Sequence, residues 1–542
     1  MKKYLYPLLT VAVLFIGFFL GNGLANRANA QQLRWGNFTL RLSKVDQLLQ
    51  YMDNSYVDKI DVDSITEDIM ADIVSKLDPH SAYIPKKDLE LVNSELEASF
   101  SGIGVQFSIQ QDTVSIVAVI SGGPSEGVGI LAGDKIVEVN DTAFTGKGIN
   151  NEKVLHTLRG EKGTEVRLGI RRSGTPEMLH FTVTRGDIPV HSVDASFIVE
   201  QQGKATGIGF VRVNKFGTGT YDEFLTALSK LKSEGAKAYI VDLRENSGGF
   251  MDQAIKMANE FLSAGDMIVY SEGRSYPRYE ARANGLGRFK QVPLVVLIDD
   301  FSASASEIFA GAMQDNDRAL IIGRRSFGKG LVQQQIPFTD GSAVRLTVAR
   351  YYTPSGRCIQ KPYELGHQED YQKDLLERFE HGEMFSRDSI RQSADTTVYY
   401  TKAGKRVYGG GGIMPDIFIG RDTTRNTPWY NRVVNHAYTY QFAFRYTDRH
   451  RKQLQQYKDW QSLERHLKQA GWMSEFVSFA KEKGVEPVEA EIQKSRPLLE
   501  RIVNAYIVRD VLGDEGFFPL FERDDDITKE AVKQLQQQTK SR

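Results

Sequence analysis

The sequence predicts a multidomain chain that combines α/β and α+β regions: a layered α/β core, a small β-rich module ahead of it, and helical regions at both ends. The chain has 542 residues, too many for a single hydrophobic core. From residue 205 onward, apolar strand-like runs alternate with amphipathic helical segments, a pattern typical of a layered α/β core. Short alternating runs separated by glycines at 100–185 are typical of a compact β module.

The overall composition excludes several classes of function. The net charge is −1, so nothing indicates nucleic-acid binding. The only cysteine is Cys358, which rules out an intramolecular disulfide, and we expect it to be a packed side chain. No motif implies a metal or nucleotide, so we expect no cofactor.

The N-terminus has the pattern of an export signal. Lys2 and Lys3 precede an apolar run at 5–20, and Ala28-Asn29-Ala30 fits a cleavage site. Residues 1–30 are therefore predicted to be a signal peptide or an uncleaved single membrane anchor, with a buried core helix as the remaining alternative. Under both export readings the rest of the chain is in the periplasm or cell envelope, either soluble or anchored to the inner membrane.

Changes in pattern divide the rest of the chain into four regions. We expect an N-terminal helical region at 31–98, the β module at 99–187, the α/β core at 188–424 with a polar surface insertion at 362–406, and a C-terminal helical region at 425–542. Apolar clusters in the last region suggest self-association into a homo-oligomer. An adaptor protein is the other possible partner. The last residues, 536–542, are expected to be disordered.

A serine lies where a strand should turn into a helix. The apolar run at 294–298 is followed by a short polar turn, and Ser304 then lies at the start of a helical pattern with Ala305 just inside it. Backbone N–H groups at a helix start have no intrahelical partner. The Ala305 N–H is thus a candidate oxyanion-hole donor, and Gly248 or Gly249, on another strand-to-helix turn, is a candidate for the second.

Lys329 follows 25 positions after Ser304, between two glycines. A lysine can take a proton from a serine hydroxyl only when it is neutral, which requires burial that lowers its pKa. Phe327 and Leu331 could provide apolar cover. Gln333 lies four residues past Lys329, on the same face of an extended strand, where its side chain could orient the amine.

Structural roles for the same residues remain open at this level. Ser302, Ser304 and Ser306 are all suited to helix caps. Lys329 could be a surface residue in a glycine turn. A Ser-His-Asp site is also open, and His80, in the turn Asp-Pro-His-Ser at 78–81, is the histidine in an obvious tight turn.

The β-rich module has features suited to peptide capture by strand addition. Gly102, Ile103, Gly104 and Val105 could offer backbone N–H groups to a terminal carboxylate beside an edge strand. Arg159 could add positive charge near that peptide. The alternatives are an ordinary glycine turn and a solvated arginine at a helix end.

Together these motifs resemble the carboxyl-terminal processing (tail-specific) proteases, the S41 peptidase type with a PDZ domain. The resemblance runs from about residue 46 into the C-terminal helices. Its specific parts are Leu77-Asp78-Pro79-His80-Ser81, the module at 100–186, Asp242-Leu243-Arg244-Glu245-Asn246-Ser247-Gly248-Gly249, Ser302–Glu307, Gly328-Lys329-Gly330 with Gln333, and Gly411-Gly412-Ile413-Met414-Pro415-Asp416.

The resemblance implies a crotonase/Clp-protease-like core with an inserted PDZ-like module that binds the C-terminal tail of a substrate. It implies that Ser304 is the nucleophile, Lys329 the general base and Gln333 the residue that positions the lysine. Two departures are visible. The family commonly has Gly-Asn-Pro where this chain has Glu245-Asn246-Ser247, and an acidic residue where this chain has Arg324.

We therefore expect an exported serine endopeptidase that uses a Ser-Lys(-Gln) acyl-enzyme mechanism on proteins or peptides with free C-terminal tails. One alternative is a non-catalytic envelope scaffold or adaptor that uses the PDZ-like module. Another is a different acyl-transfer enzyme on the same core, for which the sequence offers no phosphate-cradling glycine motif.

Overall fold

The computed structural model describes residues 32–35, 38–41, 43–94, 96–110, 112–120, 122–131, 133–172, 175–391 and 397–540. The expected signal or anchor at 1–30 lies outside these residues. The chain divides into two compact units, Met1–Lys76 and Leu77–Arg542. Within the described part of the chain, no helix is both long and apolar enough to cross a membrane.

The described residues of the first unit form two helices and a short strand pair. The strands β1 (Gln32–Trp35) and β2 (Phe38–Arg41) pair antiparallel, and α2 (Lys44–Ser55) and α3 (Val62–Ser75) follow. Ser43 and Asp46 form a capping box at the start of α2, which fixes where this helix begins. The region 31–98, expected to be helical, thus also contains strands.

The β-rich module folds as an antiparallel sheet with the strand order β10-β9-β7-β6-β5. Its elements are β4 (Ser99–Gly102), β5 (Val105–Gln110), β6 (Thr113–Val119), α5 (Pro124–Gly127), β7 (Lys135–Val139), β8 (Thr142–Ala143), α6 (Asn151–Leu158), β9 (Glu165–Arg171), β10 (Leu179–Thr184) and β11 (Gly186–Pro189). It has its own apolar core, which includes Ile116, Ile136 and Val166. β4 pairs with β11, so the two ends of the module meet. β5 lies at the edge of its sheet.

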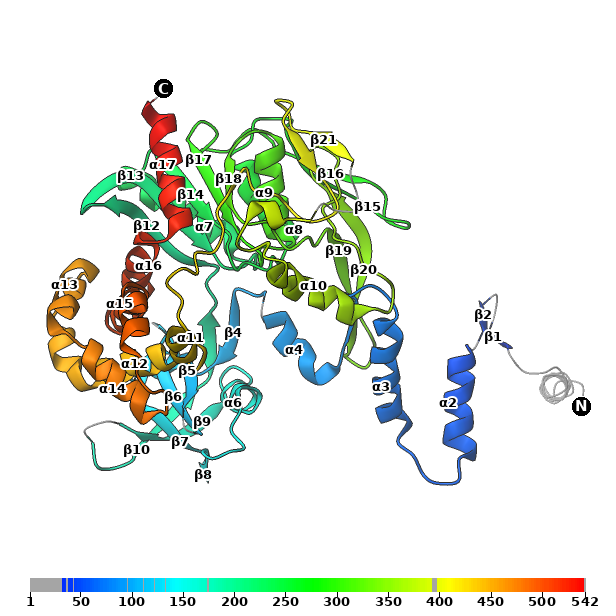
Figure 1. Ribbon diagram of the computed structural model, residues 1–542. Helices are drawn as coiled ribbons and strands as arrows, with labels where there is room; N and C mark the ends of the chain where they lie inside the picture. The colour runs from blue at the N-terminus through cyan, green and yellow to red at the C-terminus, as the bar shows by residue number, and fades with distance from the viewer. Residues whose placement is uncertain are drawn as a thin grey trace, which may run out of the picture. The chain divides into compact units, whose positions relative to one another are not determined.

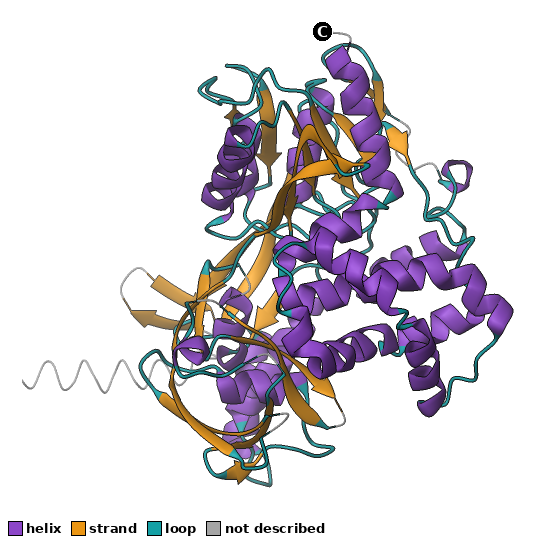
Figure 2. Ribbon diagram, turned by 90° about the vertical axis from the view of Figure 1, so that its left-hand side faces the viewer, coloured by secondary structure: helices purple, strands orange, loops and turns teal. Residues whose placement is uncertain are grey.

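The α/β core is built on a second sheet with the order β12-β13-β14-β17-β18-β23. Figures 1 and 2 show its strands with helices beside them. Its strands are β12 (Val193–Gln201), β13 (Lys204–Val213), β14 (Ala238–Asp242), β17 (Leu294–Ile298), β18 (Leu320–Gly323) and β23 (Ile417–Phe418). All are parallel except β12, which pairs antiparallel with β13. The carboxyl ends of β14, β17 and β18 therefore lie along one edge of the sheet.

Both faces of this sheet are buried, which explains the uninterrupted apolar runs in its central strands. Val241, Val296 and their neighbours on one face pack against α7 (Thr220–Ser233), α8 (Met251–Asn259) and α9 (Ala305–Asp315). Ile240, Val295 and their neighbours on the other face pack against Ile527, Ala531, Val532 and Leu535 of α17 (Asp526–Lys540). The expectation of disorder from residue 536 is therefore wrong as far as Lys540, because α17 continues to that residue.

A smaller sheet lies beside the core. It has the order β16-β15-β20-β19, and β3 (Ala82–Ile84) pairs with β20. Its strands are β15 (Met267–Glu272), β16 (Tyr279–Arg282), β19 (Leu331–Pro337) and β20 (Ala343–Tyr352). The hairpin β19–β20 matches the two strands expected around the turn at 339–342. The helix α4 (Lys86–Ser94) follows β3.

The segment 362–406 is more than a surface insertion. It contains α10 (Gln368–Glu380), the 3-10 turn η2 (Arg387–Ser389), β21 (Val398–Tyr400) and the first residue of β22 (Arg406–Tyr408). Tyr371, Arg378 and Glu383 are buried. Their burial is possible because each side chain has polar partners, described below.

The C-terminal helices form a bundle with its own core around Trp429, Phe442 and Leu499. They are α11 (Pro428–Asn435), α12 (Tyr438–Leu454), α13 (Trp460–Ala470), α14 (Met473–Glu482), α15 (Glu489–Leu512) and α16 (Asp514–Arg523). The predicted fold class, an α/β core with a β-rich module and helical regions, is confirmed.

Candidate active site

Ser304 is held on a strained turn at the start of α9. Its backbone has φ 55° and ψ −114°, a left-handed conformation that costs about 1–3 kcal/mol for a residue with a side chain. Two hydrogen bonds hold this turn: the Ser304 N–H donates to Glu307 Oε2 at 2.8 Å, and the Ala303 N–H donates to the Asn246 carbonyl at 3.0 Å. The turn presents Ser304 to a cleft of about 500 Å³.

The two neighbouring serines have structural partners. The Ser302 hydroxyl donates to the Leu243 carbonyl at 2.8 Å, and the Ser306 hydroxyl donates to the Asn246 carbonyl at 2.9 Å. Both side chains are fully buried, whereas Ser304 is partly exposed. Of the three serines, Ser304 is therefore the one that a substrate can reach.

Lys329 lines the same cleft as Ser304. Its amine donates to Gln333 Oε1 at 3.0 Å. Burial lowers the pKa of Lys329, the charge of Arg345 lowers it further, and Asp78 and Glu307 oppose the change. Within the described residues, no hydrogen bond joins the Lys329 amine to the Ser304 hydroxyl. The cleft thus makes the Lys329 amine easier to deprotonate but does not hold it in a preformed contact with the serine.

Gln333, on β19, connects the lysine to the turn at 78–81. Its Oε1 accepts from Lys329, and its Nε2 donates to the His80 carbonyl at 2.5 Å. These two contacts fix the orientation of the amide. The turn itself is organised by Asp78, which accepts hydrogen bonds from the hydroxyls of Ser81 and Thr347.

The His80 ring does not belong to a catalytic triad. Its Nε2 lies 2.9 Å from the Tyr371 hydroxyl, and the two rings meet edge to face. Burial and the charge of Lys329 lower the pKa of His80 to about 4. His80 therefore contributes its carbonyl group to Gln333, and its neutral ring packs on α10.

Glu307, which the sequence analysis did not select, connects the serine turn to the lysine turn. It is fully buried. Its Oε2 accepts from the N–H groups of Ser304 and Lys329, both at 2.8 Å. Its Oε1 accepts from the Ser326 hydroxyl at 2.5 Å and the Gly328 N–H at 2.7 Å. The Ser-x-x-Glu spacing of a capping box was the local signal for it.

The candidate oxyanion donors differ in their availability. The Ala305 N–H has no acceptor among the described residues. Gly248 (φ +103°) lies against the serine, since an added Cβ would be 2.9 Å from the Ala305 nitrogen, but its N–H already donates to Asn246 Oδ1 at 2.9 Å. Gly249 has no such acceptor within the described chain. The N–H groups of Ala305 and Gly249 are therefore the ones available to a further acceptor.

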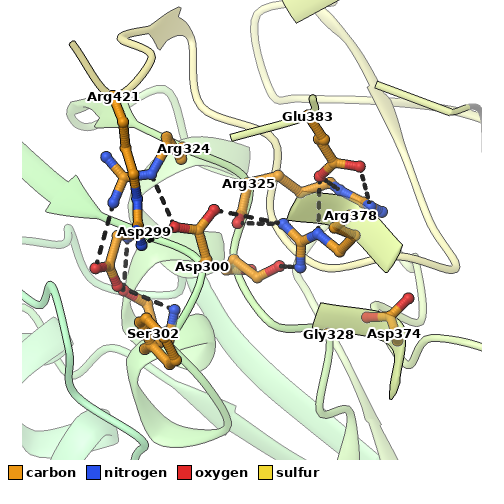
Figure 3. A network of polar contacts seen from close by, with 12 residues as sticks. Asp299, Asp300, Ser302, Arg324, Arg325, Gly328, Asp374, Arg378, Glu383 and Arg421 are labelled. Atoms are coloured by element: carbon orange, nitrogen blue, oxygen red, sulfur yellow. Dashed lines mark hydrogen bonds and ion pairs between the residues drawn. The ribbon is translucent and has the colours of Figure 1, made fainter. Parts of the chain in front are cut away.

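A network of buried charges joins the turns after β17 and β18 to the segment 362–406 (Figure 3). Arg324 Nε donates to Asp300 Oδ2 at 2.8 Å, so the unusual arginine at 324 has a carboxylate partner. Arg378 donates to the backbone carbonyls of Arg325 and Ser326. Glu383 accepts from both Arg325 and Arg378. Because breaking a buried ion pair costs about 3–5 kcal/mol, this network fixes the backbone just before the lysine turn.

The tail-binding residues expected in the β module fall into two groups. Gly102 ends β4, Ile103 is buried, and Gly104 (φ +77°) leads into Val105 at the start of edge strand β5. These four residues are continuous with an edge strand of the sheet, the kind of strand to which a peptide can add.

Arg159 belongs to a different cavity. Its guanidinium stacks 4.1 Å from the Phe100 ring centroid and donates to the Ser94 hydroxyl at 2.9 Å. The cavity that it lines, of about 640 Å³, is bounded by α4, β4 and the end of α6 and includes no residue of β5. Arg159 therefore connects the module to α4.

The described residues contain no cluster of three or more His, Cys, Asp or Glu side chains placed to hold a metal ion.

Comparison with protein families gives three matches. Residues 207–372 match peptidase family S41, and residues 101–184 match the PDZ domain. Residues 429–513, most of the C-terminal bundle, match a family of unknown function (DUF8443).

Comparison with curated proteins gives relatives that share one activity. The chain is 34% identical over 322 residues to carboxy-terminal processing protease CtpA of Bacillus subtilis, covering 59% of this chain and 67% of that protein. It is 35% identical over 327 residues to a carboxy-terminal-processing protease of Bartonella bacilliformis, covering 59% and 73%. Among solved structures, the photosystem II D1 C-terminal processing protease is 24% identical, with 70% of this chain and 92% of that chain covered at a TM-score of 0.36. The chain therefore belongs to peptidase family S41, with the carboxy-terminal processing proteases, and is a serine-type peptidase.

Proposed function

We propose that this chain is an exported endopeptidase that cleaves proteins bearing free C-terminal tails through a Ser-Lys acyl-enzyme mechanism. One observation carries the proposal: a half-buried lysine with a lowered pKa, oriented by Gln333, shares a cleft with a serine on a strained turn. The alternative of a non-catalytic scaffold would not require this arrangement.

In the proposed reaction, the neutral Lys329 amine takes the proton from the Ser304 hydroxyl as Oγ attacks the scissile carbonyl carbon. The tetrahedral oxyanion is stabilised by the Ala305 N–H and by a second donor, for which Gly249 is the better candidate. The protonated amine then gives its proton to the leaving nitrogen, and the peptide bond breaks. Water, deprotonated by Lys329, hydrolyses the ester and regenerates Ser304.

Gln333 has a positioning role in this scheme. Its Oε1 accepts a hydrogen bond from Lys329 whether the amine is neutral or protonated, and the His80 carbonyl prevents the amide from turning over. Lys329 is not hydrogen bonded to Ser304, so the lysine must approach the serine when substrate fills the cleft. Catalytic contacts often tighten only in the substrate complex.

Substrate capture is assigned to the PDZ domain. A C-terminal peptide would add to the edge of β5, with its carboxylate at the N–H groups around Gly102, Ile103 and Gly104. Arg159 is less suited to this role, because it contacts Ser94 and Phe100. Export would depend on residues 1–30, as a cleaved signal or as an anchor.

Peptide hydrolysis by single variants tests the catalytic assignment. Ser304→Ala and Lys329→Arg should abolish cleavage of a tailed peptide, because alanine has no nucleophile and arginine stays protonated and cannot act as a base. Ser229→Ala, which removes an exposed hydroxyl from α7 outside the cleft, should retain cleavage. A fluorophosphonate probe should label Ser304 in the wild type. Equal cleavage by wild type and Ser304→Ala would refute the assignment, and no cleavage by either would favour the scaffold.

Two further measurements test capture and export. Amidation of the peptide's C-terminus should raise KM and leave kcat nearly unchanged. A fusion of residues 1–30 to a reporter that is active only outside the cytoplasm should be active, and N-terminal sequencing would distinguish cleavage from anchoring.

A further inference from the structure

The last helices of the chain supply two carboxylates to an arginine beside the active site. Arg244 lies two residues past the end of β14 and is buried, with 7% of its surface exposed. Its Nη2 donates to Glu522 Oε2 at 2.7 Å, and its Nη1 donates to Asp525 Oδ1 at 2.9 Å. Asp242 accepts from the other side of the guanidinium, through Nε and Nη2, both at 2.8 Å. Glu522 is in α16, and Asp525 immediately precedes α17.

Arg244 begins the turn that holds the serine. Two residues later, Asn246 Nδ2 donates to the Val213 carbonyl, and its Oδ1 accepts from the Gly248 N–H. The Asn246 carbonyl accepts from the Ala303 N–H, directly before Ser304. A displacement of Arg244 would therefore pass through Asn246 to the glycine turn and to the backbone that presents Ser304.

The two carboxylates are themselves firmly placed. The Thr528 hydroxyl donates to Glu522 Oε2 at 2.8 Å, and the Thr528 N–H donates to Asp525 Oδ1 at 2.8 Å. In the same helix, Ile527 and Ala531 pack on the buried face of the core sheet. Figure 1 shows α17 along the strands of this sheet, at the C-terminal end of the chain. Apolar packing thus fixes the segment that carries the charges.

Neither carboxylate belongs to a segment that the family comparison matches. The S41 match ends at residue 372, and the match in the C-terminal bundle ends at residue 513. Residues 514–540 lie outside both matches, although Glu522 and Asp525 meet the turn that follows β14.

We propose that Glu522 and Asp525 are positioning residues of the active site, which hold the turn 244–249 against the serine turn through Arg244. The inference rests on the proposed function of that turn in stabilising the oxyanion. It assigns the C-terminal helices α16 and α17 to the catalytic core, where the sequence had suggested self-association. Misplacement of catalytic groups by about 1 Å can lower a rate by about 100-fold.

Steady-state kinetics of Glu522→Leu and Glu522→Gln test this inference on the full-length chain. Leucine removes both the acceptor and the charge, whereas the glutamine oxygen can still accept from Arg244. We expect Glu522→Leu to lower kcat about 10- to 100-fold with KM unchanged, and Glu522→Gln to restore part of kcat. A peptide boronate that mimics the tetrahedral adduct should lose affinity in parallel with kcat.

Glu464→Leu is the matched control. Glu464 is a buried glutamate of the C-terminal region that pairs with Arg523, the residue next to Glu522, through two contacts of 2.8 Å. Its loss should lower Tm while leaving kcat within about twofold of wild type, when each protein is assayed well below its own Tm. A wild-type kcat in Glu522→Leu, or the same fall in Glu464→Leu, would overturn the proposal.

Asp525→Leu keeps the test decisive if Glu522→Leu does not fold. The Asp525 side chain is 25% exposed, so its loss disturbs packing less. A lowered kcat with unchanged KM supports the proposal, and a wild-type kcat overturns it. Ser304→Ala, assayed in parallel, distinguishes a failure of the proposed function from a failure of the positioning role alone. If Ser304→Ala still cleaves, the proposed function itself fails, whereas an inactive Ser304→Ala with a fully active Asp525→Leu refutes only the positioning role.

Discussion

Replacing Glu307 with glutamine should loosen the serine and lysine turns together. Each carboxylate oxygen of Glu307 accepts two hydrogen bonds: Oε2 from the N–H groups of Ser304 and Lys329, and Oε1 from the Ser326 hydroxyl and the Gly328 N–H. An amide has only one oxygen. In one orientation its NH2 group faces the N–H groups of Ser304 and Lys329, and in the other it faces the Gly328 N–H and the Ser326 hydroxyl.

The size of the effect follows from the number of orphaned donors. Each buried donor without an acceptor costs about 1–3 kcal/mol. Loss of the Oε2 acceptor leaves two N–H groups unpaired, or about 2–6 kcal/mol. Loss of the Oε1 acceptor leaves the Gly328 N–H unpaired and forces the buried Ser326 hydroxyl to turn away from the new amide, so the cost is at least that of one orphaned donor, about 1–3 kcal/mol. The smaller value predicts about a 5-fold or larger increase in local opening.

Hydrogen exchange followed by mass spectrometry measures this opening locally. Peptides that cover α9 should exchange faster in Glu307→Gln, whereas peptides from α15, in the separate C-terminal core, provide an internal reference. We also expect kcat to fall, because the same bonds place Ser304 and Lys329.

Glu260→Gln is the control for this experiment. Glu260 is also buried, but each of its oxygens accepts from a single donor, the Tyr221 hydroxyl or the Arg288 N–H. The tyrosine hydroxyl can turn and accept from the new amide, so no donor is orphaned. If α9 in Glu307→Gln exchanged no faster than in Glu260→Gln, the assignment of Glu307 as the link between the two turns would be refuted.

Three further predictions concern the same site. Because neutral Lys329 is the proposed base and its pKa is lowered, kcat/KM should rise with pH and level off below the ordinary lysine range. Removing a positive charge with Arg345→Gln should move this rise to higher pH, and removing a negative charge with Asp78→Asn should move it to lower pH, both measured on an uncharged peptide. Gly248→Ala should lower kcat by about 100-fold, because its Cβ would lie 2.7 Å from Ser304 Cβ; wild-type activity would contradict this geometry. Arg378→Met should destabilise the core by about 3–5 kcal/mol in calorimetry, since it leaves Glu383 without one of its two arginines, and an unchanged transition would contradict the network.

The sequence predicted the core sheet well, but it did not predict that α17 covers one face of that sheet. Residues 238–241 of β14 and 294–298 of β17 are apolar throughout because helices cover both faces of the sheet, so their pattern is unmistakable. The end of α17 is rich in glutamine, and residues from 536 onward were expected to be disordered. Earlier in the same helix, the buried residues Ile527, Ala531 and Leu535 recur at four-residue spacing, a helical signal that the polar composition obscured.

The candidate site was predictable where the chemistry is local. Ser304, Lys329 and Gln333 occupy special positions in short motifs, and the structure places all three in one cleft. The partners that hold them were not predictable. No local pattern shows that Arg244 meets Glu522, or that Arg378 meets the backbone of Ser326, because these contacts depend on how distant segments pack.

The spacing between the serine and the lysine has a topological explanation. β17 and β18 are adjacent parallel strands, so a right-handed crossover through α9 must return the chain to the same end of the sheet. The chain leaves β17 toward Ser304, passes through α9 and β18, and leaves β18 toward Lys329. The separation of 25 positions is thus the length of one helix, one strand and the turns. The turn after β14 reaches the same edge with Gly248 and Gly249, which places the candidate oxyanion donors beside the pair. Binding sites of parallel sheets form at the carboxyl ends of the strands. A helix insertion in α9 that added a full turn would keep the motifs intact but break this register, so loss of activity would follow from topology and not from the chemistry of any residue.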